Sequence, residues 1–194
     1  MRQLSEGAEA KVFETEIFGV KSVVKSRQPK AYRIKEIDEE LRRTRTKKEA
    51  KAMLRAKEAG VEVPGLLALG KFSIYMERLS GKLLKDTKSK VSYAKIGVML
   101  AKMHAANVVH GDFTPANIII DGEKAYVIDF GLAEIGESVE NKALDMLLMK
   151  RSVSQKQYKE LASTYAKTYS DSKPVFARLA DIERRGRYQI RSLA

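Results

Sequence analysis

The sequence predicts an α+β fold in which a small β-rich lobe precedes a helical lobe. Residues 11–17 and 20–26 alternate between apolar and polar side chains, as strands of an antiparallel sheet do. Beyond Ser80, apolar residues instead recur at steps of three and four, as on helices that pack against a core. A chain of 194 residues is long enough for two such lobes that share a cleft. We therefore expect a first lobe at residues 1–78 and a second at residues 79–194.

In the first lobe, a turn around Phe18-Gly19 joins the two strands. Residues 30–59 are dense in charged residues and helix formers, and Gly60 is a stop signal for a helix. We expect residues 44–59 to form one helix and the preceding half to be helical too. The other strands of this lobe are expected at residues 65–70 and 72–78.

The second lobe opens with a helix whose apolar face is marked by Tyr93, Ile96, Leu100 and Met103. Residues 117–121 and 125–128 are typical of two short strands around a turn at Asp121-Gly122. The chain near residues 76–80 is then a hinge between the lobes. The remaining helices are expected near residues 139–150, 155–170 and 174–185.

Composition limits the chemistry. The sequence has no cysteine and two histidines, which excludes disulfides and thiolate zinc sites and leaves little for a histidine-rich metal site. It shows neither a signal peptide nor an apolar run of roughly 20 residues, so we expect a cytoplasmic protein without a membrane segment. The net charge of +12 favours an anionic partner, chiefly nucleic acid. Charge that only keeps the protein in solution is an equal alternative.

The strongest chemical signal is the run from His110 to Asn117, followed by the string Asp129-Phe-Gly. It places Asp112, Asn117 and Asp129 in the order and spacing of a phosphoryl-transfer site. In that chemistry the first aspartate orients the attacking hydroxyl, and the asparagine and second aspartate hold magnesium ions on the phosphates of ATP. An aspartate after a glycine is usually a turn residue, but the presence of Asn117 and Asp129 at the spacing of this site favours the catalytic role for Asp112. Gly111 stands where an arginine would read a phosphorylated activation loop.

A lysine must also neutralise the ATP phosphates. Lys25 ends an expected strand in Val-Val-Lys, which is similar to the Val-Ala-Ile-Lys string of that chemistry, but Lys21 shares its face and periodicity does not exclude it. Such a lysine is fixed by a helix glutamate. Glu49 is the candidate because no other acid lies between Glu40 and Glu58. The alternatives are a solvated lysine and an ordinary surface pair of Glu49 with a neighbouring lysine.

Two segments are candidates for holding the rest of the nucleotide. The N-terminal loop around Gly7 and Ala8 falls where a glycine-rich phosphate flap belongs, and its backbone amides are suited to phosphates. Met76, Glu77 and Leu79 lie where a hinge would offer backbone groups to adenine. A plain turn and an edge strand are the alternative interpretations of these two segments.

Two further features stand outside this set. Asp145 lies on an apolar helix, and we interpret it as an anchor for the catalytic-loop backbone, with an exposed aspartate as the alternative. His104 and His110 are interpreted as structural residues. Residues 184–191 carry four arginines and Tyr188, which indicates either a solvated tail or a segment that grips phosphates.

Taken together, these residues resemble the small atypical kinase subunit of the KEOPS complex. The strings that carry the resemblance lie at residues 6–10, 44–50, 110–117 and 142–145, and it extends to the arginine-rich end. The resemblance implies a minimal protein-kinase-like fold that uses ATP and magnesium. It also implies serine/threonine phosphorylation or ATP hydrolysis within the complex that makes threonylcarbamoyl-adenosine in tRNA. RIO kinases have a similar minimal architecture and are the nearest rival.

The resemblance further implies three partners: the threonylcarbamoyl-transferase subunit, a small KEOPS subunit on the first lobe, and tRNA at the arginine-rich tail. Only 14 residues, Leu132 to Asp145, follow the Asp-Phe-Gly string up to the anchor aspartate, and no Ala-Pro-Glu occurs there. Such a short segment predicts poor capture of free protein substrates and dependence on a partner. The rival function of a different class is a tRNA-binding scaffold whose nucleotide site is regulatory.

Overall fold

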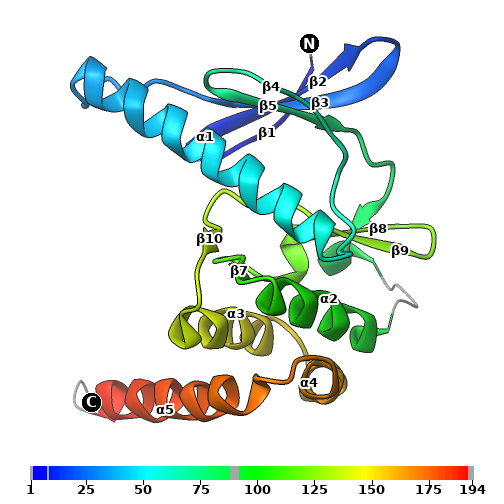
Figure 1. The fold of residues 1–194 in the computed structure, drawn as a ribbon, viewed down its shortest axis with the longest axis vertical. Helices are drawn as coiled ribbons and strands as arrows, with labels where there is room; N and C mark the ends of the chain where they lie inside the picture. The colour runs from blue at the N-terminus through cyan, green and yellow to red at the C-terminus, as the bar shows by residue number, and fades with distance from the viewer. Residues whose placement is uncertain (1, 8, 88–91, 192–194) are drawn as a thin grey trace.

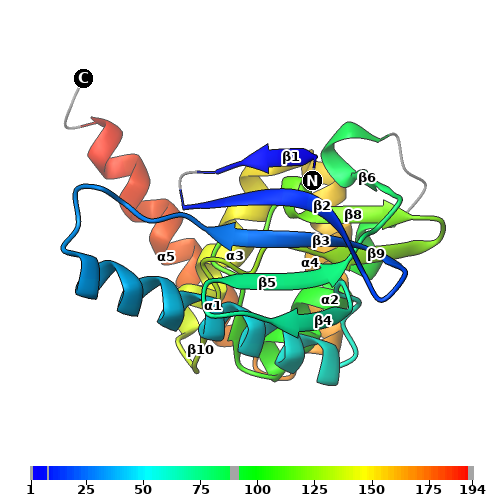
Figure 2. The ribbon, with the colours of Figure 1, turned by 90° about the horizontal axis from the view of Figure 1, so that it is seen from above.

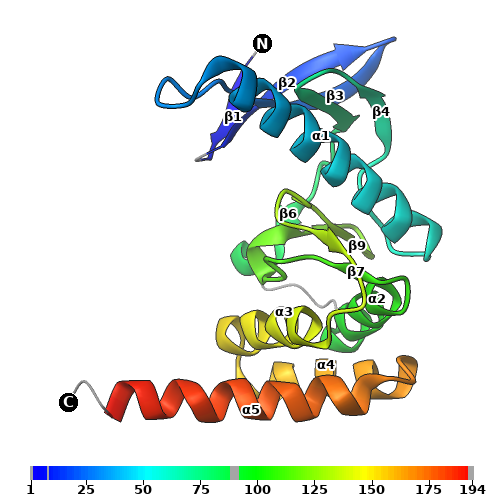
Figure 3. The ribbon, with the colours of Figure 1, turned by 60° about the vertical axis from the view of Figure 1, so that its left-hand side comes forward.

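The computed structural model describes the backbone of residues 2–7, 9–87 and 92–191, and the side chains of these residues as far as Arg185. A five-stranded sheet forms one layer and a set of helices forms another, with helix α1, Lys35–Glu58, crossing between them (Figure 1). From the side, α5, Ser172–Arg191, runs along the base of the helical layer (Figure 3). The predicted α+β class is confirmed. The division of the chain at residue 78 stays a prediction.

The sheet has the strand order β1-β2-β3-β5-β4, with antiparallel neighbours (Figure 2). Its strands are β1 Gln3–Glu6, β2 Ala10–Ile17, β3 Val20–Arg27, β4 Leu66–Leu69 and β5 Ser73–Glu77. The sequence misses β1, because its residues are all exposed and show no alternation. In the central strand β3, Lys25 pairs with Val12 of β2 and Ile74 of β5. The register thus holds Lys25 from both sides.

Helix α1 is one continuous helix, but it begins later than the sequence suggests. Residues 30–33 lie outside it, and Asp38 of the first helical turn accepts a hydrogen bond from the Lys30 amide at 3.4 Å. Before the helix the chain instead makes a turn, in which the Arg33 amide donates to the Lys30 carbonyl at 3.0 Å. The predicted helix in this region is therefore correct from Lys35 onward.

The second half of the described chain contains two small sheets, β6-β8-β9 and β10-β7, and helices α2 to α5. The strands are β6 Lys82–Leu83, β7 Val108–Val109, β8 Ile118–Asp121, β9 Lys124–Val127 and β10 Glu134–Ile135. The helices before α5 are α2 Tyr93–Ala105, α3 Val139–Ser152 and α4 Gln155–Thr168, and the single turns are η1 Leu84–Asp86 and η2 Pro115–Asn117. The sequence predicts these helices, β8 and β9. It misses the two-residue strands, which are too short to show a period.

Local sequence explains where α4 begins and how closely it packs. The Ser154 hydroxyl accepts from the Gln157 amide at 3.3 Å, and the Gln157 side chain accepts from the Ser154 amide at 2.9 Å, which makes a capping box. Gly97 of α2 lies against α4, where a Cβ atom would be 2.3 Å from the carbonyl oxygen of Leu161. A glycine is therefore required where these two helices meet.

One apolar core runs from α1 into the helical lobe. Ala52, Met53 and Ala56 of α1 belong to the same cluster of buried residues as Leu100 of α2 and Leu161 of α4. Because α1 packs on the helical lobe as well as beneath the sheet, both lobes determine where its side chains lie. Within the described parts of the chain, every helix is too short or too polar to cross a bilayer.

Candidate active site

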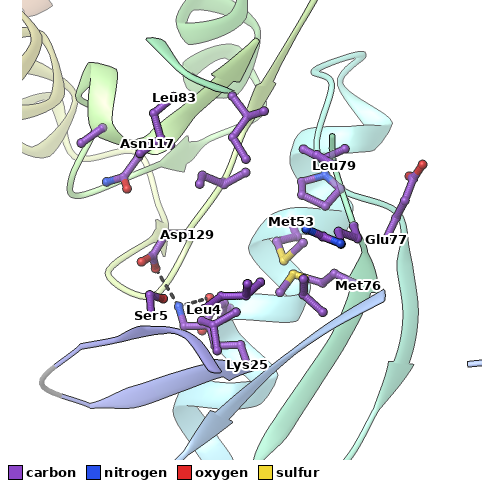
Figure 4. A pocket seen from close by; sticks show the side chains of 18 residues that line it. Leu4, Ser5, Lys25, Met53, Met76, Glu77, Leu79, Leu83, Asn117 and Asp129 are labelled. Carbon is purple, nitrogen blue, oxygen red and sulfur yellow. Dashed lines mark hydrogen bonds and ion pairs between the residues drawn. The ribbon is translucent and has the colours of Figure 1, made fainter. Parts of the chain in front are cut away.

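A cavity of about 480 Å³ opens between the sheet and the helical lobe. Strands β1, β2 and β3, helix α1, the segment after β5 and the region of β8 supply its walls (Figure 4). Most of the lining is apolar and includes Val23, Met53 and Met76, whereas Lys25 and Asp129 point toward one another on one side. An apolar cavity with a few convergent charged groups is typical of a small-molecule site.

Lys25 is the lysine that the structure places in the cavity. Its Nζ lies 2.6 Å from Glu49 Oε1 on α1 and 2.7 Å from Asp129 Oδ1, a residue 104 positions further along the chain. Lys21, which periodicity does not exclude, is exposed and lies opposite Glu16 on β2. The structure therefore brings Lys25, Glu49 and Asp129 together, as the predicted site requires. Their roles in the chemistry stay proposals.

Glu49 is buried, with 2% of its side chain exposed, and both of its carboxylate oxygens accept hydrogen bonds. Oε1 accepts from Lys25, and Oε2 accepts from Arg27 Nη2 at 2.6 Å. Sequence reasoning misses Arg27. The available signal is its spacing, because a residue two positions after Lys25 lies on the same face of β3.

Asp129 adopts a left-handed backbone conformation, with a φ of 59°. Aspartate visits this region more readily than most residues because its side chain can bond locally, and here Oδ1 accepts from the Gly131 amide at 3.2 Å. Burial raises the pKa of Asp129, but the Lys25 ammonium and the Gly131 amide lower it, and the net shift is below the ordinary value. Asp129 is therefore an anion at neutral pH, as a metal ligand must be.

Asn117 lines the cavity and is tied to Asp112. Its Nδ2 donates to the backbone oxygen and to Oδ2 of Asp112, in both cases at 2.8 Å. The side-chain oxygen of Asn117 accepts no hydrogen bond from the described residues, so it is available to a cation. The same residues include no group of three or more histidine or acidic side chains that could hold a metal alone. Asn117 and Asp129 therefore fit Mg²⁺ that takes its other ligands from phosphates and water.

Asp145 anchors the catalytic loop, which confirms its predicted role. Buried on α3, it accepts hydrogen bonds from the backbone amides of His110 at 2.7 Å and Gly111 at 2.8 Å. The buried His104 lies 3.3 Å from Asp145 through Nε2 and 2.8 Å from the Tyr165 hydroxyl through Nδ1. Burial lowers the pKa of His104 in spite of Asp145, so the ring is neutral, donates from Nε2 and accepts at Nδ1.

Gly111 leaves no room for a side chain. Its φ is 79°, and a Cβ atom would lie 2.4 Å from the carbonyl oxygen of Leu132, so the segment after Asp-Phe-Gly packs directly on the catalytic loop. His110 completes the loop, since its Nε2 donates to the Ile128 carbonyl at 3.0 Å and its Nδ1 accepts from the Asp112 amide at 3.2 Å. The structural interpretation of both histidines is thus confirmed, and these contacts hold the loop without an arginine.

The predicted hinge forms the wall of the cavity away from Asp129, with Met76, Glu77 and Leu79 in the lining (Figure 4). The backbone amides around Leu79 already have partners. Those of Glu77 and Arg78 donate to backbone carbonyls, and that of Ser80 donates to a side chain. The Leu79 amide has no partner among the described residues, so it is the hinge donor available to a ligand.

Gly7 lines a second cavity, of about 340 Å³, which also has Lys25 and Asp129 in its wall. The Gly7 amide donates to the Ala10 carbonyl at 2.9 Å and thereby shapes the turn between β1 and β2. Ala8, the other residue predicted in this flap, lies outside the described residues. Because both cavities share Lys25 and Asp129, the turn and the hinge lie on either side of these charged groups.

An apolar cavity of this kind, between a β-rich lobe and a helical lobe, places the chain in the protein-kinase-like class. Comparison with known families makes the assignment more specific, because residues 5–154 match the model of the RIO domain. The chain belongs to the RIO-domain family.

Curated relatives agree with this assignment. The chain is 40% identical over 186 residues to a probable serine/threonine-protein kinase BUD32 homolog of Archaeoglobus fulgidus, with 93% of this chain and 92% of that protein covered. It is 36% identical over 216 residues to the KEOPS complex subunit Bud32 of Pyrococcus abyssi, with coverage of 99% and 98%. It is 38% identical over 195 residues to a probable bifunctional tRNA threonylcarbamoyladenosine biosynthesis protein of Methanobrevibacter smithii, with coverage of 95% and 36%. The chain thus spans about a third of the length of the first curated relatives that it matches.

Solved structures support the fold. The Rio2 kinase from Chaetomium thermophilum matches with a TM-score of 0.67 at 18% identity, and the match covers 97% of this chain and 73% of that one. A structure of the same kinase in an ADP/Mg²⁺-phosphoaspartate complex matches with a TM-score of 0.65 at 19% identity, with coverage of 93% and 66%. At these identities the likeness shows a kinase-like fold and nothing more specific.

Proposed function

We propose that this chain is a magnesium-dependent enzyme that transfers the terminal phosphoryl group of ATP to a serine or threonine hydroxyl or to water. The observation that carries the proposal is the position of the Lys25 ammonium, which bridges Glu49 and Asp129 beside an apolar cavity. An ammonium so placed suits the α- and β-phosphates. Membership in the RIO-domain family and a relative named as a serine/threonine kinase support the same activity.

Each predicted residue then has one task. Lys25 pairs with the phosphates, and Glu49 fixes its ammonium group. Asn117 and Asp129 hold Mg²⁺, which when bound neutralises charge on the phosphates. Asp112, tied by the Asn117 amide, orients the attacking hydroxyl and accepts its proton, a contribution of roughly 10²- to 10⁴-fold in rate.

The rest of the nucleotide follows the shape of the two cavities. We place adenine in the apolar cavity against Met76, with the Leu79 amide as its donor and the backbone of Glu77 beside it. The phosphates extend past Lys25 into the second cavity, toward the predicted flap at Gly7. The free Leu79 amide and the Lys25 position support this orientation over the reverse one.

The roles of Asp112 and Asp129 are tested by replacing each with alanine. Both variants should fold as the parent chain does and lose phosphate release by about 10²-fold or more, because each removes a group that acts on the reacting atoms. Asp181→Ala is the matched control, since that carboxylate lies on α5 and pairs with Arg184 at the surface. Full retention of magnesium-dependent phosphate release in both active-site variants would refute the assignment.

We further propose that the enzyme works in the cytoplasm within a complex that makes threonylcarbamoyl-adenosine in tRNA. The relatives support this through their names, one as a KEOPS complex subunit and one as a bifunctional protein of this biosynthesis. The proposed partners are the threonylcarbamoyl-transferase subunit, a small KEOPS subunit on the β-rich lobe, and tRNA. The short segment between Asp129-Phe-Gly and Asp145 supports dependence on a partner, because little chain is available to dock a free protein substrate.

Partner dependence is tested by measuring ATP turnover by the chain alone, with the transferase subunit, and with tRNA added. Stimulation in the assembly alone is the expected result. Equal turnover in all three conditions would leave a free-standing kinase and contradict the proposed dependence.

A tRNA-binding scaffold is the second candidate, and the arginine-rich end of α5 favours it. The helix continues to Arg191, so the arginines of residues 184–191 belong to one helix. Removal of residues 184–194 should weaken RNA affinity and flatten its dependence on salt, since each phosphate contact releases counterions. Unchanged RNA binding across a salt series would exclude this segment from the interface.

A further inference from the structure

The ion pairs of the nucleotide site continue beyond Glu49. Arg27 donates from Nη2 to Glu49 at 2.6 Å and from Nη1 to Glu9 Oε2 at 3.2 Å. The other oxygen of Glu9 accepts from Arg45. Lys25, Glu49, Arg27, Glu9 and Arg45 therefore form one ladder of alternating charge, which we call the charge ladder.

The charge ladder links three separate parts of the fold. Lys25 and Arg27 come from β3, and Arg45 and Glu49 lie one turn apart on α1. Glu9 comes from the turn between β1 and β2, where its carbonyl also accepts from the Gln28 amide at 3.3 Å. The turn thus has both a backbone and a side-chain attachment, and the side-chain attachment reaches α1.

Burying these charged side chains is costly, which indicates a role other than stability. The side chain of Arg27 is 4% exposed and that of Glu49 is 2% exposed. Burying an ion pair costs hydration free energy that the attraction between the two charges barely offsets. Apolar residues in the same positions would therefore stabilise the fold equally well. What an ion pair adds is a defined position for each group. Burial raises the pKa of Glu9, but Arg45 and Arg27 lower it, and the net shift is downward, so Glu9 is charged at neutral pH.

The position of the turn matters because of what lies beneath it. The cavity of about 340 Å³ is lined by the charged groups Lys25, Arg27 and Asp129 and also by Gly7 and Glu9 of the turn. This is the cavity in which the phosphates are placed above. A carboxylate in such a wall would repel phosphates if it were unpaired, whereas Glu9 is neutralised by two arginines.

We propose that Glu9 is a positioning residue that holds the β1–β2 turn against the phosphate end of the site through Arg27 and Arg45. The inference rests on the proposed function and deepens it, because it adds a specific contribution to phosphate affinity. Glu9 acts through the turn and through Arg27, and does not touch the reacting atoms. Adenosine, which lacks phosphates, should be bound with the same affinity whether or not the attachment is intact.

The test compares Glu9→Gln with Glu6→Gln. Glu6 is the last residue of β1 and lines the same cavity, but its partner is Lys11 on β2 at 3.0 Å, so its loss leaves the charge ladder intact. Equilibrium binding of ATP, ADP and adenosine is measured for both variants and the parent chain. Glu9→Gln should lower the affinity for ATP and for ADP about tenfold, which corresponds to the loss of one charge-assisted hydrogen bond. The affinity for adenosine should stay unchanged. Glu6→Gln removes the same charge from the cavity wall without breaking the charge ladder, so it should weaken the binding of none of the three.

A double-mutant cycle with Arg45→Gln separates the specific contact from general damage. Each single variant should bind ATP more weakly than the parent chain. The double variant should bind ATP no more weakly than the single variant with the lower affinity, because both changes remove the same contact. Additive losses, or a Glu9→Gln variant that binds ATP as Glu6→Gln does, overturn the proposal. Failure of the parent chain to prefer ATP over adenosine would instead count against the proposed function itself, so the two failures are distinguishable.

Discussion

The two sides of the cavity hold their functional groups by different physics. Above it, the charge ladder joins side chains from β3, α1 and the β1–β2 turn through ion pairs, and its outer member Arg45 is 39% exposed. Below it, Asp145 is fully buried and accepts from two backbone amides and a neutral histidine. One side depends on ion pairs between side chains of separate elements, and the other on hydrogen bonds to backbone within a packed core.

The difference indicates which side can respond to a ligand. Lys25 and Asp129 bond to one another at 2.7 Å, yet each is proposed to contact phosphates or Mg²⁺, so this pair must exchange partners when a nucleotide binds. The contacts of Asp145 involve no ligand and need no exchange. We therefore expect the upper side to be adjustable and sensitive to salt, and the lower side to be a fixed platform.

The largest effect is expected from Asp145→Ala. The change leaves the amides of His110 and Gly111 and the Nε2–H of His104 without their acceptor, and each unsatisfied buried group costs about 1 to 3 kcal/mol. The free energy of unfolding should fall by about 3 to 5 kcal/mol, as measured by urea denaturation. Asp145→Asn is the control, because it keeps one acceptor and should lose less. A loss below about 1 kcal/mol for the alanine variant would contradict the fixed-platform interpretation.

Glu49→Gln should have a smaller effect on stability, with a different signature. It removes the charge that neutralises Lys25 and Arg27 but keeps a polar side chain, so we expect a loss of about 2 kcal/mol in the free energy of unfolding. Added salt should change that loss little because both cations are largely buried, so the exposed pair of Glu9 and Arg45 is where the charge ladder responds to salt. Glu39→Gln is the matched control, since Glu39 pairs with Lys71 at the surface and should lose under about 1 kcal/mol. Equal losses for the two variants at every salt concentration would remove the distinction between the buried ladder and a surface pair.

Much of the fold follows from local pattern, and what escapes prediction has a common cause. Alternation indicates β2 and β3, and helical periodicity indicates α2 and α4, because one face of each element is buried. Strand β1 gives no such signal since all its residues are exposed. The two-residue strands β7 and β10 exist through pairing with one another, which no local window reveals.

The site shows the same division. The spacing of Asp112, Asn117 and Asp129 indicates a phosphoryl-transfer site from the sequence, but the choice of Lys25 over Lys21 needs the register of β3. Spacing places Arg27 on the same face of β3 as Lys25, but its partners lie 18 and 22 positions away and are identified only in three dimensions. Contacts between charged residues on different elements carry no period and no motif, so they emerge with the tertiary structure.

The smallest effect that separates the two sides is the response to mild acid. His104 has a lowered pKa in the folded protein and the ordinary value of 6.5 when unfolded. The unfolded chain therefore binds a proton that the native protein does not, and the free energy of unfolding falls as pH drops below 6.5. At pH 5.5, one unit below the unfolded pKa, the loss from this residue is at most about 1.4 kcal/mol. Urea denaturation at pH 7.5, 6.5 and 5.5 measures it.

His104→Gln is the variant that isolates this effect. Glutamine can still donate to Asp145 but does not titrate, so the variant should be less stable overall and should lose less stability than the parent between pH 7.5 and 5.5. The pKa of Asp129 is shifted downward from 3.8, so the pair with Lys25 should persist across this range. An unchanged pH dependence in the variant would show that the anchor below the cavity is not held by a neutral histidine. A changed pH dependence would place the acid-sensitive element in the packed core, on the side opposite to the one that responds to salt.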